Sequence, residues 1–431
     1  MARLESKPGQ FINFLPRTHT NKLINKTMKH PLFFIIVFFI SISVCNAAPF
    51  TPENENLVIY QVEKTALSEK LESLRINMLE NKTNSSDLEA YVAFSINVAR
   101  KKSDPRYFGY AKAALQPTIK QYFISGTHTG LLIHWADIMQ FMHQFDEAER
   151  TLQRVINISR DNPRTNLMLS AIYQAQGRYP EALKQCNALF TRTSMLVLTA
   201  CITQIKSLTG NLKDSFTVLS KQVYRESHSN AVNHAWVLSI LAEMSERLNK
   251  NDQAADFFTE SLRLDPLNGF TRSAYADFLL DQGKYRQVKD ILSDHLFTDG
   301  LLLRYTMADV HSKSNHQSTR QEIRNNIEKL HANYSLSQKM DGDSHLRDQA
   351  IFYLYLKKQQ SKALALAKSN WEIYKEPADA RILLRCAHLA GDEKTINQLR
   401  EWKESNRYEN AVWDQIMNMD GLSGYGKGTT L

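Results

Sequence analysis

Residues 169–182, which read LSAIYQAQGRYPEA, predict two helices joined by a tight turn. Apolar residues recur at helical spacing up to Gly177, and Tyr179 and Ala182 then open a second helix. A glycine at such a turn reaches positive φ at little conformational cost. The stretch therefore indicates a helical hairpin, with a large apolar residue two positions after the turn and a small residue three positions further on.

The same hairpin pattern recurs along the chain. The first five turn residues are separated by 34, 33, 39 and 34 residues. The turn residues are His143, Gly177, Gly210, Asn249, Gly283 and Gly391, the large apolar residues are Phe145, Tyr179, Leu212 and Tyr285, and the small ones are Ala148, Ala182, Ser215, Ala254 and Val288. A hairpin this short cannot bury its own apolar face, so copies must stack on each other. We expect an all-α solenoid of stacked antiparallel helix hairpins with no regular strands.

Residues 241–266, LAEMSERLNKNDQAADFFTESLRLDP, resemble the tetratricopeptide repeat without a gap. The likeness rests on Leu241, Ala242, Asn249, Ala254, Phe258, Leu264, Asp265 and Pro266. Segments 104–107 and 376–381 also resemble secreted bacterial proteins that contain such repeats. The resemblance implies a superhelix that binds other proteins along its concave surface, and it brings no enzymatic activity.

The N-terminus has the pattern of an export signal. Lys22, Lys26, Lys29 and His30 precede the apolar run 32–44, and small residues follow up to Ala48. The run is too short for a membrane-spanning helix, which needs about 20 residues. We expect cleavage near Ala47 and a periplasmic or secreted chain, with Met28 as an alternative start of translation. Two alternatives stay open: an inner-membrane anchor formed by residues 32–44, and lipid attachment at Cys45.

Turn positions and composition divide the chain into six expected regions. These are the signal region 1–47, a linker and capping helix 48–85, a degenerate first hairpin 86–130, the repeats 131–296, degenerate C-terminal hairpins 297–409, and a flexible tail 410–431.

Charge and motifs exclude several functions. The whole chain has a net charge of +8, but residues 1–47 carry six of the basic and one of the acidic residues, which leaves +3. No basic cluster interleaved with aromatics remains, so we expect no nucleic-acid partner. No phosphate-binding loop, nucleophile elbow or metal-ligand spacing occurs, so we expect no cofactor, metal or catalysis. The remaining enzyme hypothesis is a site in 300–349, where Asp343–Asp348 mix acid, base and hydroxyl groups, although this pattern is more typical of a helix start.

The resemblance implies which residues line the concave groove. Its register places there Asp137, Gln140, Gln174, Gln204, Trp236, Glu243, Glu246, Arg247, Phe270, Asp277 and Asp281. Amides in the middle and acids later would suit a partner that carries Lys or Arg, with Trp236 and Phe270 as aromatic anchors. The alternative is that the acids only solvate a helix face. We therefore expect an exported interaction scaffold, with a membrane-associated assembly or export subunit as the alternative.

Two cysteines lie in neighbouring repeats. Cys186 falls in the second helix of one repeat and Cys201 in the first helix of the next, and such helices pack together. In an oxidising compartment the pair could form a disulfide. The alternative is that both are small buried apolar residues.

Overall fold

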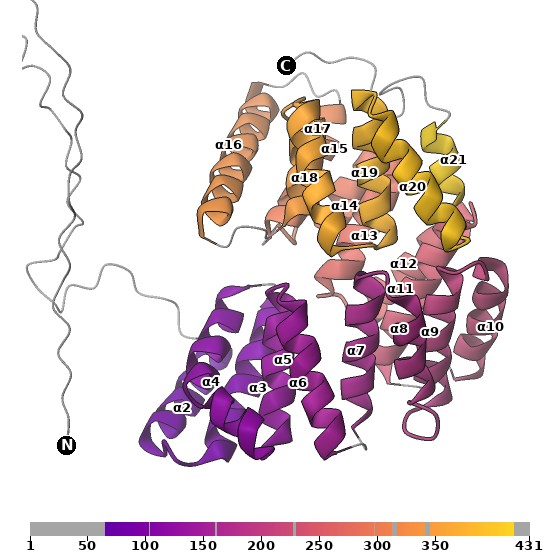
Figure 1. Ribbon diagram of the computed structural model, residues 1–431. Coiled ribbons are helices and arrows are strands. Elements are labelled where there is room, and N and C mark those ends of the chain that lie inside the picture. The colour runs from indigo at the N-terminus through magenta and orange to yellow at the C-terminus, as the bar shows by residue number, and fades with distance from the viewer. Residues whose placement is uncertain are drawn as a thin grey trace, which may run out of the picture. The chain divides into compact units, whose positions relative to one another are not determined.

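The computed structural model describes residues 65–417, except for 103, 160–161, 227–229, 297, 313–316 and 341–344. Every regular element in these residues is an α-helix (Figure 1). The prediction of an all-α solenoid is confirmed. None of the described helices combines the length and the apolarity that a membrane crossing requires. The expected signal region and the linker up to residue 64 lie outside the described residues.

The helices follow one another as antiparallel hairpins. At the N-terminal end, α2 (Ala66–Glu80) packs on the hairpin of α3 (Ser85–Lys102) and α4 (Arg106–Ser125). The five hairpins of the predicted repeat region are α5 (Thr129–Phe141) with α6 (Phe145–Ile158), α7 (Pro163–Ala175) with α8 (Tyr179–Asn187), α9 (Met195–Ser207) with α10 (Leu212–Arg225), α11 (Ala231–Arg247) with α12 (Asn251–Leu264), and α13 (Gly269–Asp281) with α14 (Tyr285–Leu292). The later elements are α15 (Asp299–His311) with α16 (Gln317–Met340), α17 (Leu346–Tyr355) with α18 (Gln360–Ile373), α19 (Pro377–Ala390) with α20 (Glu393–Ser405), and α21 (Ala411–Met417).

All six predicted turn residues adopt the left-handed conformation, with φ between 57° and 85°. At Gly177 this conformation lets the next amide, that of Arg178, donate to the carbonyl of Tyr173 at 2.8 Å. The bond satisfies a carbonyl that the helix end would otherwise leave without a partner. The spacing argument from the sequence therefore identified the turns that connect the helices of each repeat.

Burial differs between the two helices of a repeat. The second helix α10 buries one stripe, which comprises Leu212, Ser215, Phe216, Leu219 and Val223. The first helix α11 is buried nearly all round, and even the consecutive residues 244–247 are buried. A helix that is buried on every side must be covered by another element on the face that a solenoid would otherwise leave open.

The covering element is the C-terminal segment, residues 374–417. Its main chain bonds to the turn of the α7–α8 repeat, where the Lys375 amide donates to the Ala175 carbonyl at 2.7 Å. Further along, Glu409 accepts a bond from the Leu212 amide at 2.7 Å. At its end, α21 packs against α11 and α19 (Figure 1). The segment thus lies along the turn side of the earlier repeats.

The sequence predicted a flexible tail from residue 410 onward, but this boundary is wrong because a helix follows it. Residues 411–417 form α21, and its Trp413 and Ile416 are buried. These two residues, three positions apart, give a seven-residue helix one apolar face, which is too short a pattern to stand out in the sequence. Residues 418–431 lie outside the described part of the chain.

Candidate functional site

The acidic groove residues predicted from the repeat register face arginines of α19. Arg381 lies 2.8 Å from Glu246 and 3.1 Å from Asp281. Arg385 donates to both carboxylate oxygens of Asp281, at 3.0 and 2.9 Å. All four side chains are at most 12% exposed. The predicted preference for a basic ligand is thus satisfied within the chain itself.

Asp277 is held in a second ion-pair group. Arg304 donates to Asp277 at 2.7 and 2.8 Å and to Asp348 at 3.0 Å. The space left between α13, α17 and α19 is a cavity of about 40 Å³, which compares with the roughly 30 Å³ that one water occupies in the liquid. The side chain of Asp281 is only 8% exposed because α19 covers it, whereas that of Asp277 is 28% exposed.

The charges of Glu376 and Glu246, and the opposite charges of Arg247 and Arg381, act on the carboxyl group of Glu243. Burial, followed by the neighbouring carboxylate of Glu376, raises the pKa of Glu243 to about 7. Burial also raises the pKa of Glu376, the residue that precedes α19. Two carboxylates whose charges repel in a poorly solvated place resist ionisation, which is the direction of the pKa change at both residues.

The other predicted groove residues are dispersed. Asp137 is buried between Arg100 and Arg164, the second of which lies 2.7 Å away. The partly buried ones are Gln140, Gln174, Gln204 and Trp236. Phe270 is 59% exposed at the start of α13, away from the ion pairs. Partner binding by these residues, and the role of Phe270 as an aromatic anchor, stay predictions.

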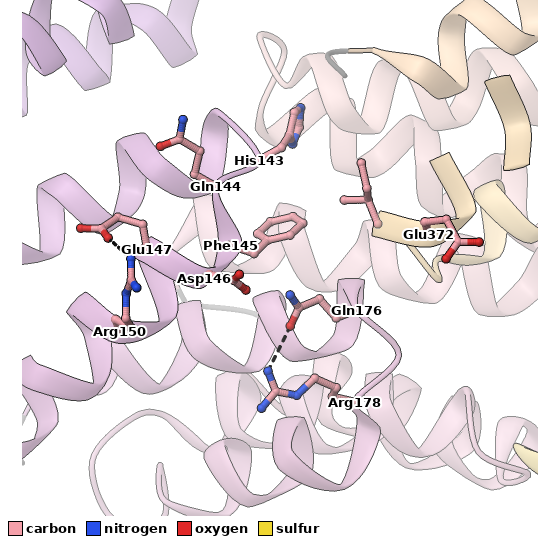
Figure 2. Close-up of a pocket in the computed structure, with 10 residues that line it drawn as sticks. His143, Gln144, Phe145, Asp146, Glu147, Arg150, Gln176, Arg178 and Glu372 are labelled. Carbon is pink, nitrogen blue, oxygen red and sulfur yellow. Dashed lines mark hydrogen bonds and ion pairs between the residues drawn. The ribbon is translucent and has the colours of Figure 1, made fainter. Parts of the chain in front are cut away.

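A larger cavity opens beside His143 (Figure 2). It has a volume of about 590 Å³, and its lining comes from the turn of the α5–α6 repeat, the turn of the α7–α8 repeat and the end of α18. The lining residues are His143, Gln144, Phe145, Asp146, Glu147, Arg150, Gln176, Arg178, Glu372 and Ile373. The fold therefore builds this cavity from segments that lie far apart in the sequence.

The charges in this cavity do not balance. Arg150 pairs with Glu147 at 2.5 Å, and Arg178 pairs with Glu149 at 2.6 Å. Asp146 and Glu372 have no ion pair or hydrogen bond within the described part of the chain. Two carboxylates thus lie beside the apolar side chains of Phe145 and Ile373 without an ion pair, although Lys375 is close enough to Glu372 for their charges to interact. Sequence spacing could not identify this pair, because 226 residues separate them.

His143 forms one wall of the cavity. Its ring hydrogen-bonds to the hydroxyl of Tyr374, and the two ring centroids lie 5.3 Å apart. Burial, with a smaller effect of His345, lowers the pKa of His143 to about 4. The imidazole is therefore neutral near pH 7, so His143 does not cancel the negative charge of the cavity.

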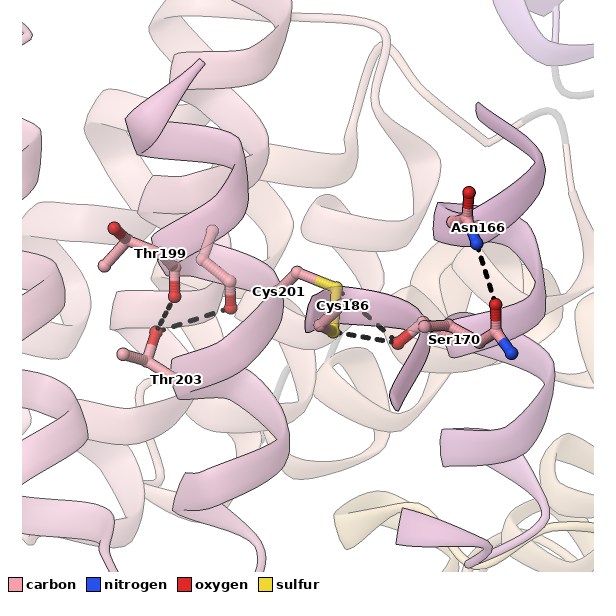
Figure 3. Close-up of a disulfide and its surroundings, with 8 residues drawn as sticks. Asn166, Ser170, Cys186, Thr199, Cys201 and Thr203 are labelled. Carbon is pink, nitrogen blue, oxygen red and sulfur yellow. Dashed lines mark hydrogen bonds between the residues drawn. A yellow bond between two sulfur atoms is a disulfide. The ribbon is translucent and has the colours of Figure 1, made fainter. Parts of the chain in front are cut away.

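Cys186 and Cys201 form a disulfide between α8 and α9 (Figure 3). Their Cα atoms lie 5.5 Å apart. The hydroxyl oxygen of Ser170 on α7 lies 3.1 Å from the Cys186 sulfur. Because a disulfide sulfur has no hydrogen, the Ser170 hydroxyl is the donor of this hydrogen bond. The bond ties one repeat to the next, which is the geometry that the repeat register implied.

The enzyme hypothesis for 300–349 gains no support from the geometry. Burial alone would raise the pKa of Asp348, but the charges of Arg304 and Arg347 outweigh it and the pKa lies below its ordinary value. Such a carboxylate stays ionised and is a poor proton donor near neutral pH. The expected helix start is present, since α17 begins at Leu346 after His345. Among the described residues, no group of His, Cys, Asp and Glu could hold a metal ion.

Comparison with known proteins points to one family. Residues 142–191 match the family model of the tetratricopeptide repeat. Among solved structures, the chain is similar to the human IFIT1 dimer with m7Gppp-AAAA, at 12% sequence identity and a TM-score of 0.40, over 79% of this chain and 86% of that chain. No curated protein matches the chain in sequence. At that TM-score the likeness carries no inference about a ligand.

Proposed function

Because this chain is a tetratricopeptide-repeat protein, we propose that it is an exported, non-catalytic scaffold that holds a protein partner at the cavity beside His143. Hairpin repeats of this kind serve as protein-interaction scaffolds, and the curvature of the stack creates an extended concave binding surface. In this chain the first-helix surface is covered by the C-terminal segment, whereas the cavity remains open. The partner site proposed here therefore lies at the repeat turns.

The observation that carries the proposal is that Asp146 and Glu372, next to Phe145 and Ile373, form no ion pair or hydrogen bond within the described residues. Such a site suits a Lys or Arg side chain, whose apolar stem packs on the aromatic ring while its charge meets the acids. The two arginines of the cavity are already paired with Glu147 and Glu149. The cavity thus retains the preference for a basic partner that the sequence predicted for the groove.

Export rests on the N-terminal sequence. The basic stretch, the apolar run 32–44 and the small residues before Ala48 form a cleavable signal. The disulfide agrees with an oxidising compartment, where such bonds persist. Mass determination of the chain recovered from its native host tests this part: a chain that begins near Ala48 supports cleavage, and a chain that retains residues 32–44 in the membrane fraction contradicts it.

Site-specific photocrosslinking tests the partner site. A photoreactive residue in place of Gln176, which lines the cavity, should capture a recurrent protein in the native host. The double variant Asp146→Asn and Glu372→Gln should remove that adduct, because the partner's cation loses both of its acids. A matched control, Asp290→Asn with Glu401→Gln, removes two exposed carboxylates elsewhere and should leave the adduct intact. An adduct that persists in the cavity variant, or the absence of any protein adduct, would contradict the proposal.

A further inference from the structure

The C-terminal segment closes the stack of repeats on itself. In a stack of hairpin repeats, each repeat normally contacts only its neighbours. Here the hydroxyl of Tyr179 donates to the Lys375 carbonyl at 3.3 Å across 196 residues, and the hydroxyl of Tyr374 hydrogen-bonds to the ring of His143 across 231 residues. The cavity beside His143 lies at this junction, because repeat turns form one of its walls and the end of α18 forms another.

A short extended link connects α18 to α19 next to the cavity. We call this link, residues 374–376, the strap. Tyr374 ends α18 with φ −122° and ψ 136°, and Glu376 precedes α19 with φ −79° and ψ 159°. Pro377 favours the extended conformation of Glu376, because the proline ring clashes with an α-helical residue before it. The strap directly follows Glu372 and Ile373, the two residues of α18 that line the cavity.

The strap is fastened to two different repeats. On the α5–α6 repeat, the ring of Tyr374 meets the rings of His143 and Phe145 edge-on, with centroids 5.3 and 5.5 Å apart. On the α7–α8 repeat, the amide of Lys375 donates to the Ala175 carbonyl at 2.7 Å. Both attachments lie within three residues of Glu372 in the sequence, so they fix the end of α18 against the turns.

The turn at Gly177 leaves room for the strap. Gly177 has a φ of 74°, and a Cβ built there would lie 3.0 Å from Cγ and 3.1 Å from Cβ of Lys375. At Gly283, a turn glycine with a similar φ of 67°, a Cβ would meet nothing within 4 Å. Glycine at 177 therefore meets two requirements, since it allows both the left-handed turn and the close approach of the strap.

We propose that the strap is a positioning element of the partner site: its docking on the two turns holds Glu372 across the cavity from Asp146, and a partner that contacts both carboxylates stabilises the docked strap in return (Figure 2). This inference rests on the function proposed for the cavity. In the described part of the chain, neither Tyr374 nor Lys375 lines the cavity, so both act through Glu372. The coupling is reciprocal, because the two equilibria share one free energy.

The alternative is that α18 alone fixes Glu372. This helix also packs on α17 and α19, and that packing could hold its last turn without help from the strap. Release of the strap would then leave the cavity unchanged. The two arrangements therefore differ in what the loss of the strap contacts does to partner capture.

Hydrogen exchange measures docking of the strap without any partner. The exchange rate of the Lys375 amide in the full chain is read by mass spectrometry of overlapping peptides. Tyr374→Ala removes a hydrogen bond and two aromatic contacts, so exchange should become faster by about tenfold or more. The Lys284 amide, which donates to the Leu279 carbonyl at 2.9 Å in the α13–α14 turn, should keep its rate. An unchanged rate at Lys375 would show that Tyr374 does not fasten the strap.

Partner capture is measured with a photoreactive residue in place of Gln144, which lines the cavity. The double variant Tyr374→Ala with Lys375→Pro lacks both the ring and the amide that fasten the strap, and the yield of the recurrent adduct should fall on the order of tenfold. It also removes the Lys375 charge, which by itself would favour a basic partner. The control Tyr285→Ala removes a partly buried tyrosine at another turn and should preserve the yield.

An engineered disulfide separates positioning from direct contact with the partner. Gly177→Cys with Lys375→Cys places two Cβ atoms about as far apart as the 3.1 Å given above, close to the roughly 3.8 Å of a disulfide. In a Tyr374→Ala background, this bridge should restore the parental adduct yield. The matched chain with serine at both positions cannot form a bridge and should stay low. Mass spectrometry without reduction verifies the bridge, and far-UV circular dichroism verifies the fold.

The outcomes distinguish this inference from the proposed function. Parental yield in the double variant would assign the position of Glu372 to α18 alone and overturn the inference. A bridged chain with a yield as low as its serine control would show that Tyr374 contacts the partner directly, which also overturns it. Both results leave the proposed function standing. The absence of any adduct at Gln144 in the parent chain would contradict the proposed function, and this inference with it.

Discussion

The guanidinium of Arg385 donates to both carboxylate oxygens of Asp281, at 3.0 and 2.9 Å, across 104 residues of chain. Arg381, one helical turn earlier, joins the same carboxylate to Glu246. Helix α19 therefore presents two arginines at i and i+4 spacing to acids from two different repeats. The acidic surface that would otherwise attract a basic partner is instead part of the chain's own tertiary structure.

The substitution Asp281→Asn should destabilise the fold strongly. It leaves two nearly buried guanidinium groups without their shared carboxylate, and breaking a buried ion pair in this way costs about 3–5 kcal/mol. The free energy of unfolding, measured by urea titration with far-UV circular dichroism, should fall by that amount. Asp290→Asn is the control, because this exposed carboxylate should change stability by no more than about 0.5 kcal/mol. Equal effects of the two variants would contradict the ion-pair assignment.

Glu243 makes stability depend on pH. Its pKa of about 7 in the folded chain exceeds the ordinary value of 4.5, so the folded state binds more protons than the unfolded state between these two pH values. The contribution to stability is fully present below about pH 4.5 and is lost as pH rises through 7. Glu243→Gln should remove this dependence and raise the free energy of unfolding above pH 7 by on the order of 2 kcal/mol.

The measurement compares the variant with the parent chain at each pH, since other titrating groups then cancel. The two chains should have the same stability near pH 4.5 and diverge as pH rises. The exposed residue Glu401 provides the control Glu401→Gln, which should run parallel to the parent at all pH values. A stability difference for Glu243→Gln that does not change with pH would show that the carboxyl group does not titrate in this window.

Substitutions at two turn glycines can distinguish the cost of backbone strain from the cost of a clash with the C-terminal segment. Gly210 and Gly283 both have positive φ, at 85° and 67°. A Cβ on Gly210 would lie 2.8 Å from the Cβ of Arg407, whereas one on Gly283 would meet nothing within 4 Å. Gly283→Ala should therefore cost only the backbone strain, and Gly210→Ala about 1–2 kcal/mol more. Thermal unfolding of both variants checks this, and equal costs would place Arg407 away from the turn.

The sequence predicted the hairpins well because their determinants are local. The turn residues, from His143 to Gly391, satisfy a conformational requirement that a single position reveals. The covering of Glu246 by Arg381 could not be predicted in the same way, since spacing within a repeat contains no information about which distant helix returns to it. In the sequence, the polar residues around Glu246 are typical of an exposed helix face. The cavity acids Asp146 and Glu372 escaped notice for the same reason, because each belongs to an ordinary helix end.

The disulfide provides the last prediction. Cys186 and Cys201 close a loop with a sequence separation of 15, and a bridge of that length stabilises a fold by about 3 kcal/mol. The double variant Cys186→Ala with Cys201→Ala should lose about that much free energy of unfolding, and a reducing agent should lower the stability of the parent chain but not of the variant. Cys386 offers an internal check: it is buried, and burial raises its pKa to about 12. Alkylation of the folded chain should therefore spare Cys386 until the chain unfolds, whereas modification of Cys186 or Cys201 without prior reduction would show that the bridge is absent.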